Sequence, residues 1–414
     1  MSRLAPETRT QRSAWPEPGR LVGVDVARSI AVFGMFTVHL GVGSIGLLDG
    51  PAAEAFHELA RGRSSALFAF LAGVSLALLS GGAHPSSDAS RRRVGVKIAV
   101  RAMALTLLGM FLDLLGAPIA IILVYYAGYF LLALPLLRLG AGALAGIAAA
   151  IALLGPQLSF LIRSLIGDPG APAASIDGLG DFFLSGYYPA CTFMAFVVAG
   201  MAVGRLDLRS APARAGLAGT GLVLAALGYG GSWLLMHPLG GVDRLTRTLA
   251  AQYYGTAAET APAEDLLLLG DLTLEEIASL HGTVPTDSPF WLLVASPHSG
   301  TTFEIAGAVG TALVVLAACL FLADLLHRGV FPLAAAGSMV LTVYVGHVVV
   351  IAMLGGSSYD FSPFRLELFV LGALLFATLW KLLLGRGPLE RLLGWSADGA
   401  TRLALSGASP ARRP

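Results

Sequence analysis

The chain has 414 residues, of which 56% are hydrophobic and 13% charged, and its mean hydropathy is +0.75. This composition excludes a soluble globular domain. The formal net charge of +1 gives no support for nucleic-acid binding, and the basic residues gather at the ends of apolar segments, as membrane topology requires.

The order of polar and apolar segments predicts a polytopic membrane protein. Residues 1–19 are polar and have no apolar core, which predicts a disordered cytoplasmic tail rather than a cleaved signal. About ten apolar segments follow, each near the length of about 20 residues that crosses a bilayer as a helix. We expect helices at 22–40, 62–80, 96–116, 118–137, 141–163, 187–204, 215–236, 301–325, 335–355 and 365–385. The predicted fold class is an all-α membrane bundle.

The distribution of Arg and Lys predicts the orientation of this bundle. If the N-terminus is cytoplasmic, the basic stretch Arg91–Lys97 and most other cations fall on the inside, so both termini are predicted to be cytoplasmic. The predicted organisation is a cytoplasmic tail at 1–20, an N-terminal bundle at 21–236, an extracytoplasmic loop at 237–300, a C-terminal bundle at 301–390 and a second cytoplasmic tail at 391–414.

Two predicted outward loops are long enough to have a function. The shorter one, 167–186, contains three aspartates, and the longer one, 237–300, contains many acidic and aromatic residues and a possible helix near Pro262–Leu280. The long loop is expected either to cover an extracytoplasmic cavity or to be a solvated acidic loop without a binding role.

The first predicted span contains ionisable residues, which are costly in hydrocarbon and therefore point to a functional site. Asp25 and Arg28 are three residues apart and share one face of a helix. The pair is predicted either to fix helix orientation or to face a ligand, because Arg suits phosphate or carboxylate recognition. His39 lies fourteen residues after Asp25, about 21 Å along a helix, so it is expected near the opposite membrane face.

Other polar residues are expected near the outer half of the bundle. His57 lies in the first outward loop, and Arg63 leads into the second span. His298 and Glu304 lie at the outer start of the eighth span, and His347 follows Tyr344 in the ninth. Histidine is the natural general base for acyl transfer, although a loop or buried histidine is as readily solvated or structural.

Several common catalytic classes lack their usual motifs. The sequence contains no HExxH, Walker A, GxSxG or CxxC pattern. Cys191 and Cys319 lie in apolar runs and are predicted to be small buried hydrophobes without metal or disulfide chemistry.

Three stretches carry a resemblance to a known family. The run Arg20-Leu-Val-Gly-Val-Asp-Val-Ala-Arg28 with His39, and the run Arg61-Gly-Arg-Ser-Ser leading to Gly73, resemble heparan-α-glucosaminide N-acetyltransferase-like proteins and the related bacterial YeiB-type proteins. The segment Gly337–His347, with Gly387-Pro-Leu-Glu390, resembles the YeiB-type tail. The chain departs from the family's Asp-x-x-Arg-Gly in having Ser29.

The resemblance implies an acyltransferase that takes an acyl group, acetyl above all, from cytoplasmic acyl-CoA and gives it to an acceptor outside. The eukaryotic members acetylate a terminal glucosamine and use a histidine in the first non-cytoplasmic loop. His39 and His57 compete for that role here, and His39 is preferred. His298, Glu304 and His347 are predicted to assist it, Asp25 and Arg28 to bind acyl-CoA, and Arg63 and Tyr344 to bind the acceptor.

We therefore expect a multi-pass acyltransferase in a bacterial cytoplasmic membrane, with an extracytoplasmic sugar, lipid or cell-wall acceptor and no metal. The oligomeric state stays open, a homodimer included. One alternative is a small-solute transporter with helices interrupted at Pro135, Pro156 and Pro189, although no internal repeat accompanies them. A non-catalytic membrane scaffold is the other.

Overall fold

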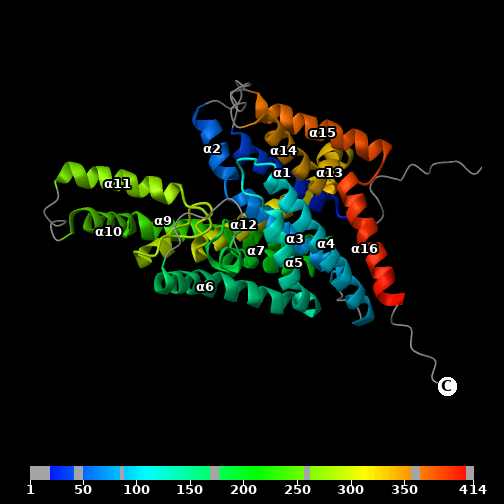
Figure 1. The fold of residues 1–414 in the computed structure, drawn as a ribbon, viewed down its shortest axis with the longest axis horizontal. Helices are drawn as coiled ribbons and strands as arrows, with labels where there is room; N and C mark the ends of the chain where they lie inside the picture. Colours follow the sequence, from blue (N-terminus) through cyan, green and yellow to red (C-terminus); the bar gives the residue numbers. More distant parts are fainter. Residues whose placement is uncertain are drawn as a thin grey trace, which may run out of the picture.

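The computed structural model describes residues 19–41, 50–83, 88–167, 176, 178–255, 262–355 and 364–406, and these form helices and connecting turns without a β-strand (Figure 1). The predicted all-α class is confirmed. The predicted tail at 1–19 lies almost wholly outside the described residues, as do Asp168 and Asp177 of the shorter outward loop. The α-helices are α1 (Val22–Leu40), α2 (Pro51–Ala60), α3 (Arg63–Leu79), α4 (Asp88–Leu114), α5 (Leu123–Ala133), α6 (Ala141–Ile166), α7 (Ala190–Gly204), α8 (Ala211–Ala225), α9 (Gly231–Met236), α10 (Gly241–Tyr254), α11 (Ala263–Ala278), α12 (Thr302–Leu326), α13 (Phe331–Ser338), α14 (Val340–Leu354), α15 (Arg365–Leu383) and α16 (Pro388–Ser406).

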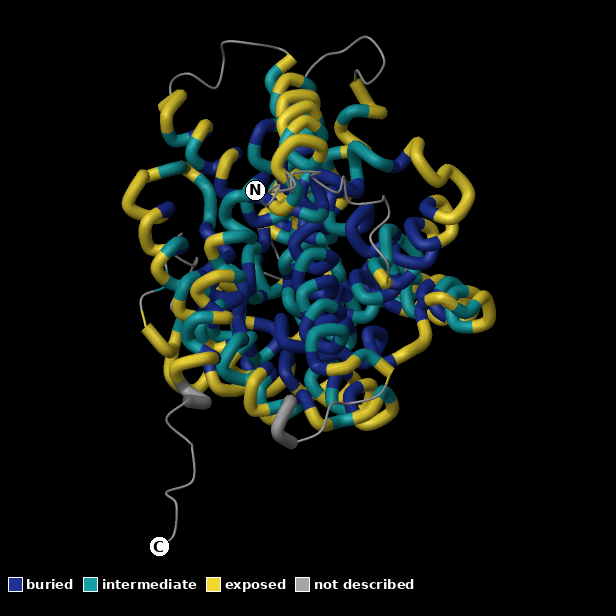
Figure 2. Tube along the Cα trace, turned by 90° about the vertical axis from the view of Figure 1, so that its right-hand side faces the viewer, coloured by how far each residue is buried: buried dark blue, intermediate teal, exposed yellow. Residues whose placement is uncertain are grey.

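Apolar helices of membrane-crossing length dominate the fold. In the described part of the chain, seven helical segments are long and apolar enough to cross a bilayer. Three further apolar helices, Leu123–Arg138, Ala190–Gly204 and Val340–Leu354, are shorter. All ten overlap predicted spans, although Pro51–Leu79 begins before the span expected at 62–80 and Thr302–Ser338 continues past the one expected at 301–325. Buried residues fill the centre of the bundle while exposed residues cover its outside (Figure 2). The chain is a multi-pass membrane protein by these features.

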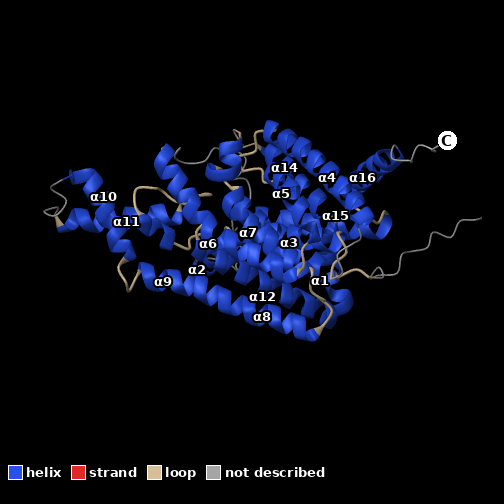
Figure 3. Cartoon of the chain, turned by 90° about the horizontal axis from the view of Figure 1, so that it is seen from below, coloured by secondary structure: helices blue, strands red, loops and turns tan. Residues whose placement is uncertain are grey.

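Glycine allows the central helices to approach closely. A Cβ atom on Gly200 of α7 would lie 1.8 Å from the Phe70 carbonyl oxygen of α3, and one on Gly73 would lie 1.9 Å from the Val197 carbonyl oxygen. Only glycine fits at these two positions, as in other membrane helix pairs that pack through small residues. On another side of the bundle α8 runs alongside α12 (Figure 3).

The two halves of the chain pack together around α1. Helix α1 contacts α3 from the N-terminal half and α12, α13 and α15 from the C-terminal half. A Cβ on Gly337 of α13 would lie 1.7 Å from the Asp25 carbonyl oxygen, so α13 touches the α1 backbone beside the Asp25–Arg28 pair. Met339 (φ −129°, ψ 41°) then separates α13 from α14.

The two ends of the bundle differ. The α10–α11 hairpin, which lies within the predicted loop 237–300, projects from one end (the hairpin end), and α11 agrees with the predicted short helix (Figure 1). At the other end (the α16 end), α16 packs on α4, and the Lys97 ammonium lies 2.7 Å from the Asp398 carboxylate. This ion pair lowers the pKa of Asp398. The described part of the predicted C-terminal tail, residues 391–406, is helical and belongs to α16.

Candidate functional site: an arginine-lined cavity and a histidine pair

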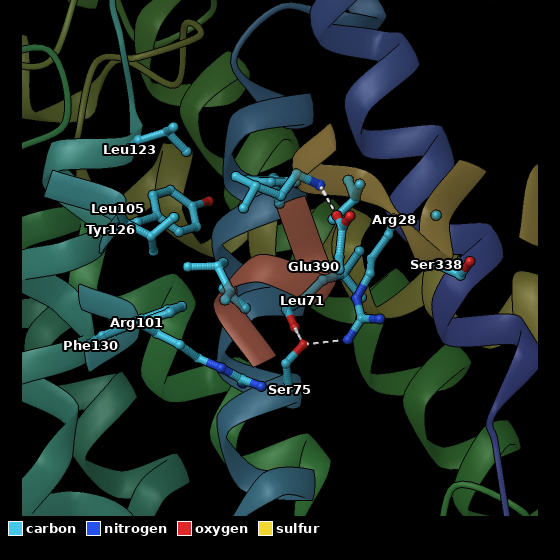
Figure 4. A pocket seen from close by; sticks show the side chains of 16 residues that line it. Arg28, Leu71, Ser75, Arg101, Leu105, Leu123, Tyr126, Phe130, Ser338 and Glu390 are labelled. Carbon is cyan, nitrogen blue, oxygen red and sulfur yellow. Dashed lines mark hydrogen bonds between the residues drawn. The ribbon is translucent and has the colours of Figure 1, made fainter. Parts of the chain in front are cut away.

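A cavity of about 260 Å³ opens inside the bundle near the α16 end. Its walls come from both halves of the chain, namely from α1, α3, α4 and α5 of the N-terminal half and from α13, α14 and α16 of the C-terminal half (Figure 4). Most lining side chains are apolar. The polar lining residues are Arg28, Ser75, Arg101, Tyr126, Ser338 and Glu390.

Arg28 is held in place at the cavity wall. Its Nη1 donates to Asp25 Oδ1 over 2.9 Å and its Nη2 donates to Ser75 Oγ over 2.6 Å. Arg20 donates from Nε to the other Asp25 oxygen over 2.5 Å. The buried Asp25 carboxylate is therefore shared by two guanidinium groups and lies behind Arg28, outside the cavity lining. Any effect of Asp25 on a ligand would act through Arg28.

Arg101 of α4, which was not among the predicted site residues, brings a second positive charge to the cavity. Figure 4 shows the side chains of Arg28 and Arg101 reaching toward Ser75 from different helices. Two guanidinium groups that converge on one place repel each other, and an anion between them would offset this repulsion, as Asp398 does in part for Arg101. The signal was present in the sequence as an ionisable residue inside a predicted span.

Glu390 closes the cavity from α16. Its Oε1 accepts from the backbone N–H groups of Leu341 (2.8 Å) and Thr342 (3.1 Å), and its Oε2 accepts from the Thr342 hydroxyl (2.6 Å). The carboxylate thus satisfies the first N–H groups of α14, where the helix dipole favours negative charge. This cap ties the C-terminal helix to the break between α13 and α14.

Aromatic side chains lead from the cavity toward the hairpin end. The ring of Phe68 lies 5.2 Å from that of Tyr126 and 6.3 Å from that of Tyr344, between centroids. The ring of Tyr344 lies 5.1 Å from that of His347. The cavity is thereby joined to a histidine through continuous ring contacts.

His39 and His347 form a hydrogen-bonded pair across 308 residues of sequence. His39 Nδ1 lies 3.0 Å from His347 Nε2, and the rings are stacked 5.3 Å apart. His347 Nδ1 donates to the Tyr344 carbonyl, so with neutral rings its Nε2 must accept from His39 Nδ1. This assignment leaves the lone pair of His39 Nε2 available, and the arrangement can orient a general base.

The remaining predicted residues divide between two neighbouring groups at the hairpin end. In the first, Arg63 Nε donates to the Tyr229 hydroxyl over 3.1 Å, and the guanidinium lies 4.6 Å from the Tyr229 ring centroid. Glu304 is buried in the first turn of α12 and interacts electrostatically with Arg63. Tyr229, which was not among the predicted site residues, lies in a π-helical turn at Ala226–Gly230.

The second group surrounds His298. Its ring lies 6.1 Å from that of His281 and 5.8 Å from that of Tyr188. Burial, together with the neighbouring His281 and Arg61, lowers the pKa of His298 to about 3, so the ring is neutral at physiological pH. Its backbone has φ 62°, a left-handed conformation that non-glycine residues seldom adopt.

His57 is the one predicted histidine that lies apart from these groups. It is half-buried on α2 and lines a shallow hollow formed with Ala53, Glu54 and Glu58 of the same helix. The structure thus brings His39 and His347 together and places Arg63 with Glu304, while His57 is on the periphery. The chemical roles of all these residues stay predictions.

An apolar groove of about 480 Å³ approaches the histidine pair from the side. It runs between α14 and α15 and is lined by Phe36, His347, Phe369, Gly346 and Gly372. In the described part of the chain, no group of three or more His, Cys, Asp or Glu side chains is placed to hold a metal ion.

Comparison with known proteins identifies the family. A comparison with curated proteins gave no match. The family described as "Heparan-alpha-glucosaminide N-acetyltransferase, catalytic" matches residues 20–236, which is more than half of the chain. The matched segment contains Asp25, Arg28, His39 and Arg63, whereas His298, Glu304 and His347 lie beyond it. The chain belongs to the heparan-α-glucosaminide N-acetyltransferase family.

Proposed function

We propose that this protein is a membrane acyltransferase that moves an acyl group, acetyl above all, from cytoplasmic acyl-CoA to an extracytoplasmic sugar, lipid or cell-wall acceptor. Its proposed location is the bacterial cytoplasmic membrane. The observation that supports this most is the connected site itself: an arginine-lined cavity at one end, a histidine pair toward the other, and aromatic side chains between them.

The cavity suits the donor. Arg28 and Arg101 supply positive charge for the phosphates of CoA, and the apolar wall suits the pantetheine arm and a short acyl chain. In the proposed reaction His39 Nε2 takes the proton of the acceptor O–H or N–H group. The acceptor atom bonds to the thioester carbonyl carbon, the C–S bond breaks, and the CoA thiolate takes the proton from the His39 imidazolium.

Purified protein in detergent is used to test whether it binds and cleaves acyl-CoA. We expect saturable binding of acetyl-CoA and release of free CoA thiol, measured by calorimetry and by a thiol reagent. The proposal would be overturned in favour of a transporter if the protein neither bound acetyl-CoA or a longer acyl-CoA nor released thiol from it, and if it took up a solute into proteoliposomes.

Arg28→Lys tests whether the cavity binds the donor. Lysine keeps the charge but cannot donate to Asp25 and Ser75 from two nitrogens at once, so the affinity for acetyl-CoA should fall roughly tenfold, about 1.4 kcal/mol. Arg101→Gln should weaken binding at least as much. Arg138→Lys, at an exposed position, is the matched control. Wild-type affinity in Arg28→Lys and Arg101→Gln would show that the arginines are structural.

The proposed topology has ten spans with both termini in the cytoplasm, which requires the three shorter apolar helices to cross as well. In a chain without Cys191 and Cys319, we expect Asp207→Cys, on the turn between α7 and α8, to react with an impermeant thiol reagent from the cytoplasm. Ser279→Cys, after α11, should react from outside. Labelling of both from the same side of sealed vesicles would contradict this topology.

A further inference from the structure

Two tyrosine hydroxyls inside the bundle have no hydrogen-bond acceptor for their protons among the described residues: those of Tyr126 and Tyr344, the second of which interacts only with the backbone of Ile122. The exposed fractions of these residues are 3% and 1%, so bulk water does not supply the missing bonds. Phenylalanine has nearly the same shape and would avoid the cost of burying an unpaired hydroxyl. Packing alone therefore does not explain why tyrosine occupies these positions.

Neighbouring tyrosines show the contrast. The Tyr129 hydroxyl donates to the Tyr188 carbonyl, and the Tyr125 hydroxyl accepts from the Tyr187 N–H over 3.1 Å. These side chains are buried in the same part of the bundle, and their hydroxyls are satisfied by the protein. The Tyr126 hydroxyl has no such partner, and the Tyr344 hydroxyl has only the backbone of Ile122 beside it.

The two unpaired hydroxyls belong to the connected site. Tyr126 lines the arginine-lined cavity and its hydroxyl points into it (Figure 4). Tyr344 follows the lining residue Leu341 by one helical turn on the same face of α14. Both rings contact Phe68, and the two hydroxyl groups are close enough to interact electrostatically. We expect a ligand oxygen at the inner end of the cavity, beside Tyr126, to lie within reach of both groups.

We propose that the hydroxyls of Tyr126 and Tyr344 bind the carbonyl oxygen of the acyl thioester and stabilise the negative charge that develops on it. This inference rests on the proposed acyltransferase function. When the acceptor atom bonds to the carbonyl carbon, the C=O π electrons move to the oxygen, which then accepts two O–H hydrogen bonds. Expulsion of the CoA thiolate restores the double bond. Each tyrosine keeps its proton throughout, and buried donors fixed in advance are effective for this purpose.

The position of this oxygen agrees with that of the base. Tyr344 contacts His347, which is hydrogen-bonded to His39, so a thioester held by the two hydroxyls would lie beside the histidine pair. The phosphates of the donor would then lie toward Arg28 and Arg101. One extended donor can therefore occupy the cavity with its reactive end toward the base.

Tyr126→Phe and Tyr344→Phe test the proposal, with Tyr129→Phe as matched control. We expect each test variant to melt at or above the wild-type temperature, because it loses an unpaired hydroxyl, and to lose about a hundredfold in kcat for thiol release. The KM for acetyl-CoA should change less than kcat. Tyr129→Phe should melt at a lower temperature, because it loses a hydrogen bond, and should keep wild-type kcat at temperatures where it is folded.

A binding experiment separates failure of this proposal from failure of the proposed function. Wild-type protein should bind acetyl-CoA more tightly than S-ethyl-CoA, which has no thioester carbonyl oxygen, and the double variant Tyr126→Phe/Tyr344→Phe should lose this preference. Wild-type turnover and an unchanged preference in the double variant would overturn the tyrosine assignment and leave the acyltransferase function standing. Absence of acyl-CoA binding and thiol release in the wild type would overturn the function and, with it, this assignment.

Discussion

Replacing His39 with alanine is expected to lower acyl transfer by at least about a hundredfold, the lower end of the contribution of a positioned general base. The hydrogen-bond chain from the Tyr344 carbonyl through His347 leaves the His39 Nε2 lone pair free to take a proton. Binding of acetyl-CoA should persist, because His39 does not line the arginine-lined cavity. The measurement is thiol release together with the dissociation constant of acetyl-CoA.

His57→Ala is the control for this prediction, because His57 lies on the surface of α2 away from the histidine pair. It should keep near wild-type turnover. His347→Ala should lower turnover as well, but by less than His39→Ala does. The turnover of the double variant should be little lower than that of His39→Ala alone, because the two rings act as a unit. An inactive His57→Ala with an active His39→Ala would assign the base to α2 instead.

Arg205→Met is expected to lower the free energy of unfolding by roughly 3 kcal/mol or more, as for other buried charges whose partners are left behind. Arg205 is buried and donates to the carbonyl oxygens of Ala77, Gly82, Leu137 and Leu139 and to the Ser80 hydroxyl. Methionine would remove all of these hydrogen bonds from a buried site. The measurement is thermal unfolding in detergent.

Arg209→Met provides the comparison for Arg205→Met. Arg209 is exposed and donates to the Gly19 carbonyl over 2.7 Å, so its replacement should change the melting temperature little. Equal melting temperatures for the two variants would mean that the hydrogen bonds of Arg205 contribute nothing beyond those of a surface arginine.

The positions of the helices could be predicted from sequence because hydrophobic length alone determines them. The expected span 22–40 coincides with α1, and 365–385 nearly coincides with α15. The spacing of Asp25 and Arg28 likewise predicted their ion pair, because a contact three residues apart depends only on local helix geometry. Breaks such as that at Met339 depend on tertiary partners, in this case the Glu390 cap on α14, and no local pattern indicates them.

The candidate site was less predictable because it is built from contacts between distant helices. His39 and His347 each stood out as polar residues in apolar segments, yet nothing in the sequence pairs them with each other rather than with His298 or Glu304. Tyr126 and Arg101 were missed for different reasons. Aromatic residues are common in membrane helices, so Tyr126 gives no signal, whereas Arg101 resembles the basic residues that determine topology.

The close packing of α1 against α13 limits how this protein can be divided. The segment that matches the catalytic family ends at residue 236, but it lacks His347, Tyr344 and the walls of the cavity formed by α13, α14 and α16. Asp25 touches Gly337 backbone to backbone, without room for a Cβ atom between them. A shortened gene encoding only the matched segment would leave the cavity open on one side, without Ser338 and Glu390, so the C-terminal helices are an integral part of the site and not an interchangeable appendage.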